Sequence, residues 1–336
     1  MAILVTGGAG YIGSHICVEL LRIGEDVIVL DNFSNAKPEV IGRIKQIAGR
    51  DFPARAADVR HEAAVRQVFA DYDVEAVIHL AGLKAVGESQ VLPLRYYQHN
   101  VAGALVLCAA MQEAGCKTLV FSSSATVYGA EGPVPFREDH PLSAVNPYGR
   151  TKIMIEQILR DLHASDSAWR IASLRYFNPI GAHESGLIGE DPLGTPNNLL
   201  PCIAQVAAGR RPRLTVYGGD YDTADGAAVR DYVHVADLAQ GHVSALTYLR
   251  GYTGAEAFNL GTGRGYSVLE LVSAFAAVSG RPIPYVIAPR RAGDIAVCYA
   301  DAAKAEKILG WRTRRSLRQM CADAWRFTRT MLETAK

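Results

Sequence analysis

The feature that most constrains the fold is a glycine-rich turn between a β-strand pattern and a helix pattern near the N-terminus. The apolar run AILVT leads into TGGAGYIG, and a segment with helical periodicity, SHICVELLRIG, follows and stops at Gly24. Gly7, Gly10 and Gly13 allow a tight turn in which backbone N–H groups and the helix N-terminus approach a pyrophosphate. The pattern predicts a parallel sheet with a dinucleotide site at its first crossover.

A second strand pattern, DVIVLD, ends at Asp31 and favours NAD as the dinucleotide. The carboxylate can accept hydrogen bonds from an adenosine ribose but would repel a 2′-phosphate. The following NFSNA contains no arginine that could bind a 2′-phosphate, so NADP is disfavoured. An ordinary turn before a helix is the alternative interpretation of the glycines. A P-loop is excluded because no Gly-Lys-Ser or Gly-Lys-Thr follows.

Strand and helix patterns alternate through the first half of the chain and predict the fold class. Further buried strands are expected at 76–82 and 118–124, with helices between them, so right-handed βαβ units should build a parallel sheet. From about residue 179 the sequence is rich in glycine, proline and asparagine, and short segments follow. Ser267 is expected to cap one late helix and Asp301 to cap another.

We therefore expect an α/β protein with a Rossmann-type doubly wound parallel sheet and a smaller interleaved α/β domain. Residues 1–178 are expected to form the NAD-binding domain, with returning segments near 230–262. Residues 179–336 are expected to form the substrate-binding domain. No clean linker separates the two parts, which is why we expect them to be interleaved.

Composition and charge exclude several classes of protein. The formal net charge of +1 argues against a nucleic-acid partner, and the absence of an 18-residue apolar run argues against a membrane span. The N-terminus lacks the basic start and cleavage site of a signal peptide. Six cysteines without any C-x-x-C spacing suggest neither a metal site nor a disulfide framework, so we expect a cytoplasmic protein without bound metal.

A serine, a tyrosine and a lysine form the candidate catalytic group. The strand pattern TLVFSSS ends at Ser124, at the edge of the sheet where ligands of parallel α/β folds bind. The later segment NPYGRTK places Tyr148 and Lys152 four residues apart, on one face of a helix. Such a pair is common on exposed helices, but the combination with a dinucleotide turn and a strand-end serine is much more specific.

These motifs together resemble the extended short-chain dehydrogenases/reductases and, within them, the UDP-glucose 4-epimerase family. The resemblance runs nearly end to end, through VTGGAGYIGSH, LAGLKAVGES, FSSSATVYG, NPYGRTK, LRYFNPIGAH, GEDP, PNNLLP, VRDYVHVADLA, FNLGTG and PRRAGD. It implies an NAD-dependent, reversible 4-epimerisation of UDP-galactose and UDP-glucose in galactose metabolism, through a transient 4-keto sugar. It also implies a homodimer, formed through helices expected at 92–115 and 148–163.

The resemblance gives each catalytic residue a role. Tyr148 would remove the proton of the sugar 4-hydroxyl while a hydride passes from C4 to NAD, and Ser124 would hydrogen-bond the same oxygen. The usual pKa of tyrosine is about 10, so we expect Lys152 and the positive charge of the nicotinamide to lower the pKa of Tyr148. NAD would be regenerated in each turnover and would act as a bound cofactor.

The other site residues also follow from the resemblance, and Lys84 and Tyr148 are shared between the cofactor group and the UDP-sugar group. The cofactor group comprises Gly7, Gly10, Tyr11, Ile12, Gly13, Asp31, Asn32, Asn35, Asp58, Val59, Leu80, Ala81, Gly82, Lys84, Asn100, Ser122, Tyr148, Lys152 and Phe177. The UDP-sugar group comprises Lys84, Ser124, Tyr148, Asn178, Asn198, Leu199, Tyr217, Arg230, Arg291, Asp294 and Cys298. Arginines suit the diphosphate because a guanidinium group pairs with its oxygens in bidentate geometry.

Two alternative functions are weaker. An epimerase or dehydratase acting on another nucleotide sugar uses the same scaffold, but a dehydratase needs acidic residues just after the serine. Ala125 and Thr126 occupy those positions and cannot remove water from a sugar. A non-catalytic dinucleotide sensor predicts loss of the serine, the tyrosine or the lysine, and all three are present.

Cys298 marks a departure that bears on substrate size. Some members of the family carry a tyrosine at this place in the wall of the sugar pocket, and cysteine leaves more room. We therefore expect UDP-N-acetylglucosamine and its galacto epimer to be accepted as well. The alternative is that Cys298 is a small buried residue whose neighbours fill the space.

Overall fold

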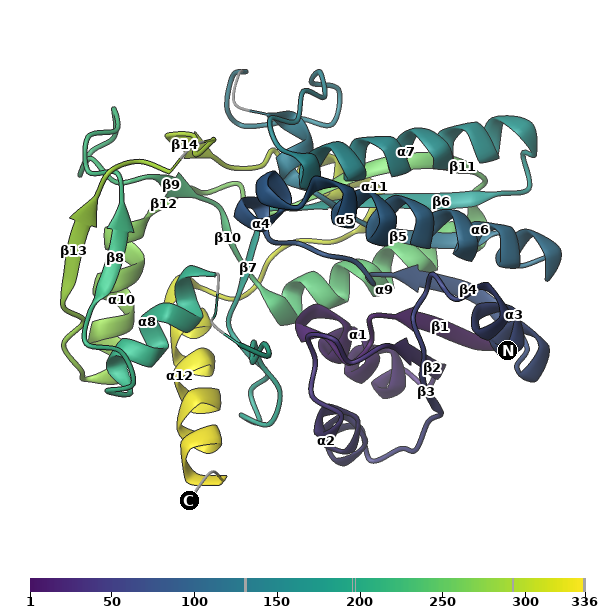
Figure 1. Ribbon diagram of the computed structural model, residues 1–336, viewed down its shortest axis with the longest axis horizontal. Helices are drawn as coiled ribbons and strands as arrows, with labels where there is room; N and C mark the ends of the chain where they lie inside the picture. The colour runs from purple at the N-terminus through teal and green to yellow at the C-terminus, as the bar shows by residue number, and fades with distance from the viewer. Residues whose placement is uncertain (130–131, 195, 197, 292, 335–336) are drawn as a thin grey trace.

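A seven-stranded parallel sheet forms the centre of the larger part of the protein. The computed structural model describes residues 1–129, 132–194, 196, 198–291 and 293–334, which Figure 1 draws as ribbon. The strand order is β11-β6-β5-β4-β1-β2-β3, and all neighbouring strands run parallel. These strands are β1 (Ala2–Thr6), β2 (Asp26–Asp31), β3 (Ala54–Ala56), β4 (Val74–His79), β5 (Thr118–Ser124), β6 (Arg170–Tyr176) and β11 (Gly254–Leu260).

Helices cover both faces of this sheet because successive side chains along its strands point alternately into two apolar cores. Ile3 and Val5 face one core, whereas Leu4 between them faces the other. The first core is closed by α1 (Tyr11–Arg22), α2 (Glu39–Ala48), α9 (Val235–Gly251) and α11 (Ala303–Leu309). The second is closed by α3 (Glu62–Asp71), α6 (Gly103–Glu113) and α7 (Pro147–Ser165). This doubly wound arrangement confirms the predicted Rossmann-type α/β class.

The remaining elements build a smaller lobe with an apolar core of its own. In Figure 1 this lobe lies at the left, and β7 (Asn178–Ile180) and β10 (Tyr232–His234) run between it and the large sheet. Its helices are α8 (Leu199–Ala207), α10 (Val268–Ser279) and α12 (Leu317–Thr334). Its other strands are β8 (Leu214–Tyr217), β9 (Val229–Arg230), β12 (Tyr266–Ser267), β13 (Tyr285–Ala288) and β14 (Val297–Cys298).

The chain crosses between the two parts more than once. After the smaller lobe has begun, α9 packs on the large sheet and β11 extends that sheet as its edge strand beside β6. Strand β10 pairs with β7, from the start of the second half of the chain. These crossings involve the segment near 230–262 that we expected to return. The assignment of a separate cofactor domain and substrate domain stays a prediction.

Local signals in the sequence fix several helix ends. Ser267 and Glu270 form the expected capping box at the start of α10, and Gly310 ends α11 in a left-handed conformation. Asp301 accepts the N–H of Ala303 at 2.9 Å, although the residue at the cap position of α11 is Ala302.

The helix expected at 92–115 is present as a continuous helical run from Pro93 to Glu113, but it contains a π-helical turn that was not predicted. The chain forms α5 (Pro93–Tyr96), a π-helical turn (Tyr97–Ala102) and α6 in succession, after α4 (Val86–Val91). The wider turn carries Asn100, whose buried amide binds other segments, and π-helical turns commonly occur at functional sites.

The sequence led us to expect neither disulfides or a metal site nor a membrane-spanning helix. All six cysteines are free, and no group of three or more metal-binding side chains is found among the residues that the structure describes. Within the same part of the chain, every helix is too short or too polar to cross a membrane.

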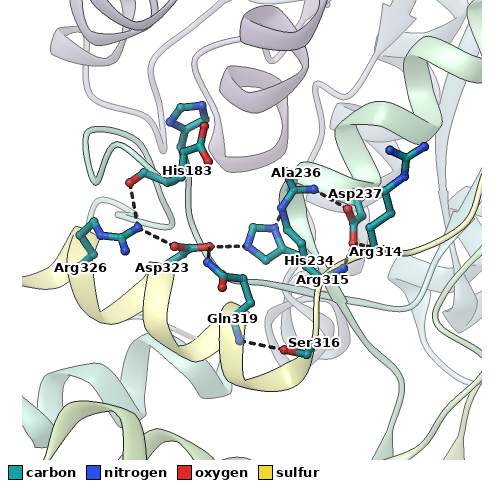
Figure 2. A network of polar contacts seen from close by, with 12 residues as sticks. His183, His234, Ala236, Asp237, Arg314, Arg315, Ser316, Gln319, Asp323 and Arg326 are labelled. Atoms are coloured by element: carbon teal, nitrogen blue, oxygen red, sulfur yellow. Dashed lines mark hydrogen bonds and ion pairs between the residues drawn. The ribbon is translucent and has the colours of Figure 1, made fainter.

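A buried polar network joins α12 to the rest of the protein. Figure 2 shows Asp323 of α12 accepting hydrogen bonds from His234, Gln319 and Arg326. The carboxylate is 1% exposed, and its hydrogen bonds and the nearby cations hold its pKa below the usual value against the effect of burial. The same view shows Asp237 binding the chain just before α12, where it accepts the backbone N–H groups of Arg314 and Arg315 at 2.9 Å each.

Removal of the Asp323 carboxylate should destabilise the protein strongly. Asp323→Ala leaves the buried His234 Nε2 without its acceptor, and we expect the free energy of unfolding to fall by about 2–4 kcal/mol. Thermal and urea unfolding measure this loss. Gln319→Ala removes one neutral donor and should cost less than about 1.5 kcal/mol. Equal losses in the two variants would contradict the central position of Asp323 in the network.

Candidate active site

The glycine-rich turn is too tight for side chains at two of its positions. Gly7 has a φ of 73°, and a Cβ atom there would lie 2.8 Å from the backbone nitrogen of Ala81. A Cβ atom on Gly13 would lie 2.2 Å from the carbonyl oxygen of Gly7. Gly10 stands at the cap position of α1, so the turn runs directly into the helix N-terminus. This cradle fits a pyrophosphate that approaches backbone N–H groups.

The carboxyl end of β2 supplies the residues expected at the adenosine. The Asp31 carboxylate accepts the N–H groups of Ala9 at 3.0 Å and of Phe33 at 2.9 Å, which fixes its direction beside the turn. Burial raises the pKa of Asp31, and these two hydrogen bonds oppose the rise. Asn32 donates to Asp58 at 2.9 Å, so two residues expected at the cofactor lie together. The donors and acceptors of this group therefore fit a dinucleotide.

The segment after β4 lies against the turn after β1. The Leu80 N–H donates to the Thr6 carbonyl at 3.0 Å, and the buried His79 and Thr6 side chains are 2.7 Å apart. Parallel β1 and β4 are neighbours at the point where the strand order reverses, and ligands of open α/β sheets bind in the crevice there. Gly7 and Ala81, both expected at the cofactor, meet in this crevice.

Asn100 binds the protein with both groups of its side chain. Its amide donates to the Leu83 carbonyl and to the Thr151 hydroxyl at 3.0 Å each, and its oxygen accepts the Leu83 N–H at 2.8 Å. These contacts join the segment after β4 to the helix that carries Lys152. Asn100 thus fixes the spacing between two sides of the candidate site, and its own contact with a cofactor stays a prediction.

Lys84 faces the second half of the chain. Its ammonium binds the Glu190 carboxylate at 2.9 Å, and the Asn198 amide donates to the same carboxylate oxygen at 2.5 Å. Lys84 was expected at the cofactor and at the substrate, and Asn198 at the substrate, so the structure brings two expected residues together. Glu190, which joins them, is only 10% exposed and was not identified from the sequence.

Lys152 is buried beneath the candidate base. Its ammonium donates to the Ser122 carbonyl at 2.6 Å and lies 4.8 Å from the centre of the Phe121 ring. The distance to the centre of the Tyr148 ring is 5.7 Å. Burial lowers the pKa of Lys152 to about 8, and the negative charge of Glu156 opposes this lowering.

Tyr148 stands in the first turn of α7, where two neighbours fix the backbone. Asn146 caps the helix by accepting the Gly149 N–H at 2.9 Å, and Pro147 occupies the first helical position. Burial raises the pKa of Tyr148, and a hydrogen bond with Ser124 opposes the rise. In the chain without a cofactor, burial disfavours the phenolate and the Lys152 ammonium is directed at a carbonyl. The expected lowering of the Tyr148 pKa included the positive charge of the nicotinamide, so it stays a prediction for the protein with bound NAD.

Ser124 is held in place by the residue two positions later. The Thr126 backbone N–H and hydroxyl donate to the Ser124 hydroxyl oxygen at 3.2 Å and 3.0 Å. Ser124 ends β5 and begins a single 3-10 turn (Ala125–Tyr128), so its side chain leaves the sheet at its carboxyl edge. Sequence reasoning considered Thr126 only as evidence against a dehydratase and missed its contact with Ser124.

Several residues expected at the UDP-sugar contact one another or a residue expected at the cofactor. Cys298 shares a small apolar cluster with Phe177, which was expected at the cofactor, and β14 pairs with β9 so that Cys298 is the partner of Arg230. The Arg291 guanidinium binds Asp294 at 2.9 Å and lies 4.9 Å from the centre of the Tyr217 ring. Asn178 lies in β7, directly after Phe177, and Leu199 is the first residue of α8.

Comparison with known proteins places the chain in a family. Residues 3–261 match the NAD dependent epimerase/dehydratase family. The chain is 60% identical over 327 residues to the UDP-glucose 4-epimerase of Bacillus subtilis (strain 168), which covers 97% of this chain and 96% of the relative. The chain belongs to the NAD dependent epimerase/dehydratase family. Both the family resemblance and the NAD dependence expected from the sequence are confirmed.

The similarity of this family member to solved structures extends over nearly its whole length. The crystal structure of UDP-glucose 4-epimerase from Bifidobacterium longum in complex with NAD+ and UDP has a TM-score of 0.96 at 50% identity and covers 98% of each chain. The UDP-Glc/GlcNAc 4-epimerase of Campylobacter jejuni has a TM-score of 0.85 at 35% identity and covers 98% of this chain and 99% of its own. The match includes the smaller lobe, beyond the residues of the family match.

Sequence reasoning missed the buried charges behind the candidate site of this epimerase/dehydratase. Glu156 and Arg175 form an ion pair at 2.7 Å, and both are almost fully buried. Glu156 could have been found, since it lies four residues after Lys152 and so on the same face of α7. Arg175 carries no comparable signal, because only the parallel pairing of β5 and β6 brings it beside that helix.

Proposed function

We propose that the protein catalyses the reversible, NAD-dependent 4-epimerisation of UDP-hexoses and interconverts UDP-galactose and UDP-glucose. One observation carries the proposal: Ser124, Tyr148 and Lys152 converge at the carboxyl edge of the sheet, beside the glycine cradle. A sugar bound at this edge would therefore lie next to both a proton acceptor and the dinucleotide site. The UDP-glucose 4-epimerases similar over nearly the whole chain support the same reaction.

The residues around the crevice would hold the cofactor. The cradle formed by Gly7, Gly10 and Gly13 would receive the pyrophosphate, and Asp31 would bind the adenosine ribose. Lys84 would turn from Glu190 toward the nicotinamide ribose. Bound NAD would supply reversible hydride transfer at the sugar C4.

Side chains of the protein would carry out the proton transfer. Tyr148 accepts the proton of the sugar 4-hydroxyl, and Ser124 hydrogen-bonds the same oxygen as it becomes a carbonyl. The Lys152 ammonium lies 5.7 Å from the centre of the Tyr148 ring and would favour the phenolate together with the positive charge of the bound nicotinamide. The 4-keto sugar then turns in the pocket, and Tyr148 returns the proton to the oxygen at C4 of the epimer.

The smaller lobe would hold the UDP group while the sugar turns. Arg230 and Arg291 would bind the diphosphate, and Tyr217 would lie beside the uracil. Asp294 holds Arg291 at 2.9 Å and would fix the direction of its guanidinium group. We infer from this division that residues 1–178, with the segment near 230–262, bind the cofactor and that residues 179–336 bind the substrate.

A product assay tests the proposed reaction. The purified protein is incubated separately with UDP-galactose and UDP-glucose, with and without added NAD, and the sugars are resolved by chromatography. Each substrate should give its 4-epimer, and both mixtures should reach the same ratio. Release of a 4-keto-6-deoxy sugar would instead identify a dehydratase, and no conversion of either sugar would contradict the proposal.

We propose that the protein also accepts N-acetylated sugars. Cys298 is 9% exposed and packs in one cluster with Phe177, and a tyrosine ring at this position would take up more space than the thiol. We expect turnover of UDP-N-acetylgalactosamine in the unchanged protein, and Cys298→Tyr should lower it by about 100-fold while UDP-galactose is still converted. Cys298→Ser, of similar volume, serves as the control. The idea is wrong if the unchanged protein does not convert the N-acetylated sugar.

An exposed apolar surface supports a homodimer. Val91, Leu94, Leu105 and Met154 lie on α4, α5, α6 and α7, and their side chains are 44–77% exposed. Figure 1 shows these helices side by side on one face. Two such surfaces would bury one another about a two-fold axis. Sedimentation equilibrium should give twice the 36.2 kDa chain mass, and a monomer at micromolar concentration would contradict the dimer.

We also place the reaction in the cytoplasm, as part of galactose metabolism. All six cysteines are free and five of them are buried, which suits a reducing compartment. Localisation of a tagged protein in cells tests this placement.

A further inference from the structure

A buried network of charges lies behind the catalytic residues. The Glu156 carboxylate is 1% exposed and accepts the Ser123 hydroxyl at 2.5 Å. Arg175 donates to both of its oxygens, at 3.0 Å from Nε and 2.7 Å from Nη2. Arg175 also donates to the Tyr128 hydroxyl at 2.9 Å, which in turn donates to Asn259 at 2.6 Å. The network thus joins α7 to three neighbouring parts of the sheet.

Each end of the network is adjacent to a catalytic residue. Ser123 directly precedes Ser124 at the end of β5, and Tyr128 closes the turn that follows it. Glu156 lies four residues after Lys152, so both side chains are on one face of α7. A carboxylate that binds β5 and belongs to α7 therefore fixes the distance between Ser124 and the Tyr148–Lys152 pair.

We propose that Glu156 is a positioning residue of the reaction: its carboxylate holds the end of β5 against α7 and is the buried negative charge that faces the Lys152 ammonium. The link to turnover rests on the proposed function, whereas the charge relation between Glu156 and Lys152 does not.

The charged groups around Lys152 determine in which direction its pKa changes when Glu156 is replaced. Glu156 favours the ammonium, and burial opposes it, with the result that its pKa is about 8. His79 from β4 is buried, and its lowered pKa of about 3 leaves it neutral. Tyr148 and Tyr176 are the other titratable groups nearby, and in the chain without a cofactor burial raises the pKa of both. Arg175 from β6 is a fixed cation on the far side of Glu156.

Loss of the Glu156 charge should therefore release the Lys152 proton at lower pH. Glu156→Gln keeps the size of the side chain and an acceptor for Ser123 but removes the charge. NMR of protein labelled with 13C at the lysine Cε would measure the titration of Lys152. The Lys152 resonance is the one that disappears in the variant Lys152→Met. The midpoint should fall by about one pH unit. In turnover assays, the alkaline limb of the pH profile for kcat should move down by the same amount.

Two further variants separate the charge from the packing. Ser123→Ala removes one hydrogen bond and keeps the charge, so the Lys152 midpoint should not move. Arg175→Met removes the cation that neutralises Glu156, so the midpoint should rise, and this variant decides the question if Glu156→Gln does not fold. An unchanged midpoint in Glu156→Gln, or an unchanged or lower one in Arg175→Met, overturns the proposal. If the unchanged protein converts no UDP-hexose, the proposed function fails, but the titration still tests the role of Glu156.

Discussion

Replacement of Tyr148 by phenylalanine is expected to lower kcat for UDP-galactose by about 10²- to 10⁴-fold, the range of general acid–base catalysis. The change removes one hydroxyl and keeps the ring that packs above Lys152. Binding of the nucleotide sugar should be nearly unchanged, because the groups expected to hold UDP lie in the smaller lobe. Steady-state kinetics and calorimetric titration with UDP-galactose measure the two effects separately.

A matched control is available for this substitution. Tyr285 is 45% exposed on β13 in the smaller lobe and is not among the residues expected to contact cofactor or substrate, so Tyr285→Phe should leave kcat unchanged. Retention of most of the activity in Tyr148→Phe would move the base to another residue. Loss of both sugar binding and activity in Tyr148→Phe would show that the Tyr148 hydroxyl binds the substrate rather than transfers its proton.

Substitution of Gly13 by alanine is expected to weaken NAD binding by at least about 30-fold, or about 2 kcal/mol. The added Cβ would lie 2.2 Å from the Gly7 carbonyl oxygen and 2.7 Å from the Gly8 Cα, so backbone atoms of the cradle must move. The N–H groups that face the pyrophosphate move with them. Fluorescence titration of the purified protein with NAD measures the loss.

Gly42 provides the control for the alanine substitution itself. It lies in α2, and a Cβ atom there would meet nothing within 4 Å. Gly42→Ala should leave NAD binding unchanged and should stabilise the protein by about 0.5–1 kcal/mol, because alanine favours helix. Equal NAD binding by Gly13→Ala and the unchanged protein would contradict the position of the pyrophosphate in the cradle.

The features predicted correctly from the sequence are those that local chemistry determines. Glycine is required where a turn leaves no room for Cβ, so Gly7 and Gly13 identified the cradle before its geometry was known. The capping box of Ser267 and Glu270 identified the start of α10 in the same way. The spacing of Tyr148 and Lys152 placed them on one helical face.

The features that were missed depend on tertiary contacts. Lys84 and Glu190 are 106 residues apart, and no local pattern indicates that they meet. The π-helical turn carries Asn100, whose side chain contacts Leu83 and Thr151, and no local pattern indicates these contacts. The burial that raises the pKa of Tyr148 in the chain without a cofactor also follows from tertiary packing, which periodicity does not measure.

Transfer of an isotope at C4 tests the central claim most directly. UDP-galactose labelled with deuterium at C4 is converted in ordinary water, and the position of the label in UDP-glucose is determined by NMR. We predict that the deuterium is retained at C4, because the hydrogen removed there is returned to the same carbon while Tyr148 exchanges only the proton on oxygen. UDP-glucose that carries solvent hydrogen at C4 would contradict this account.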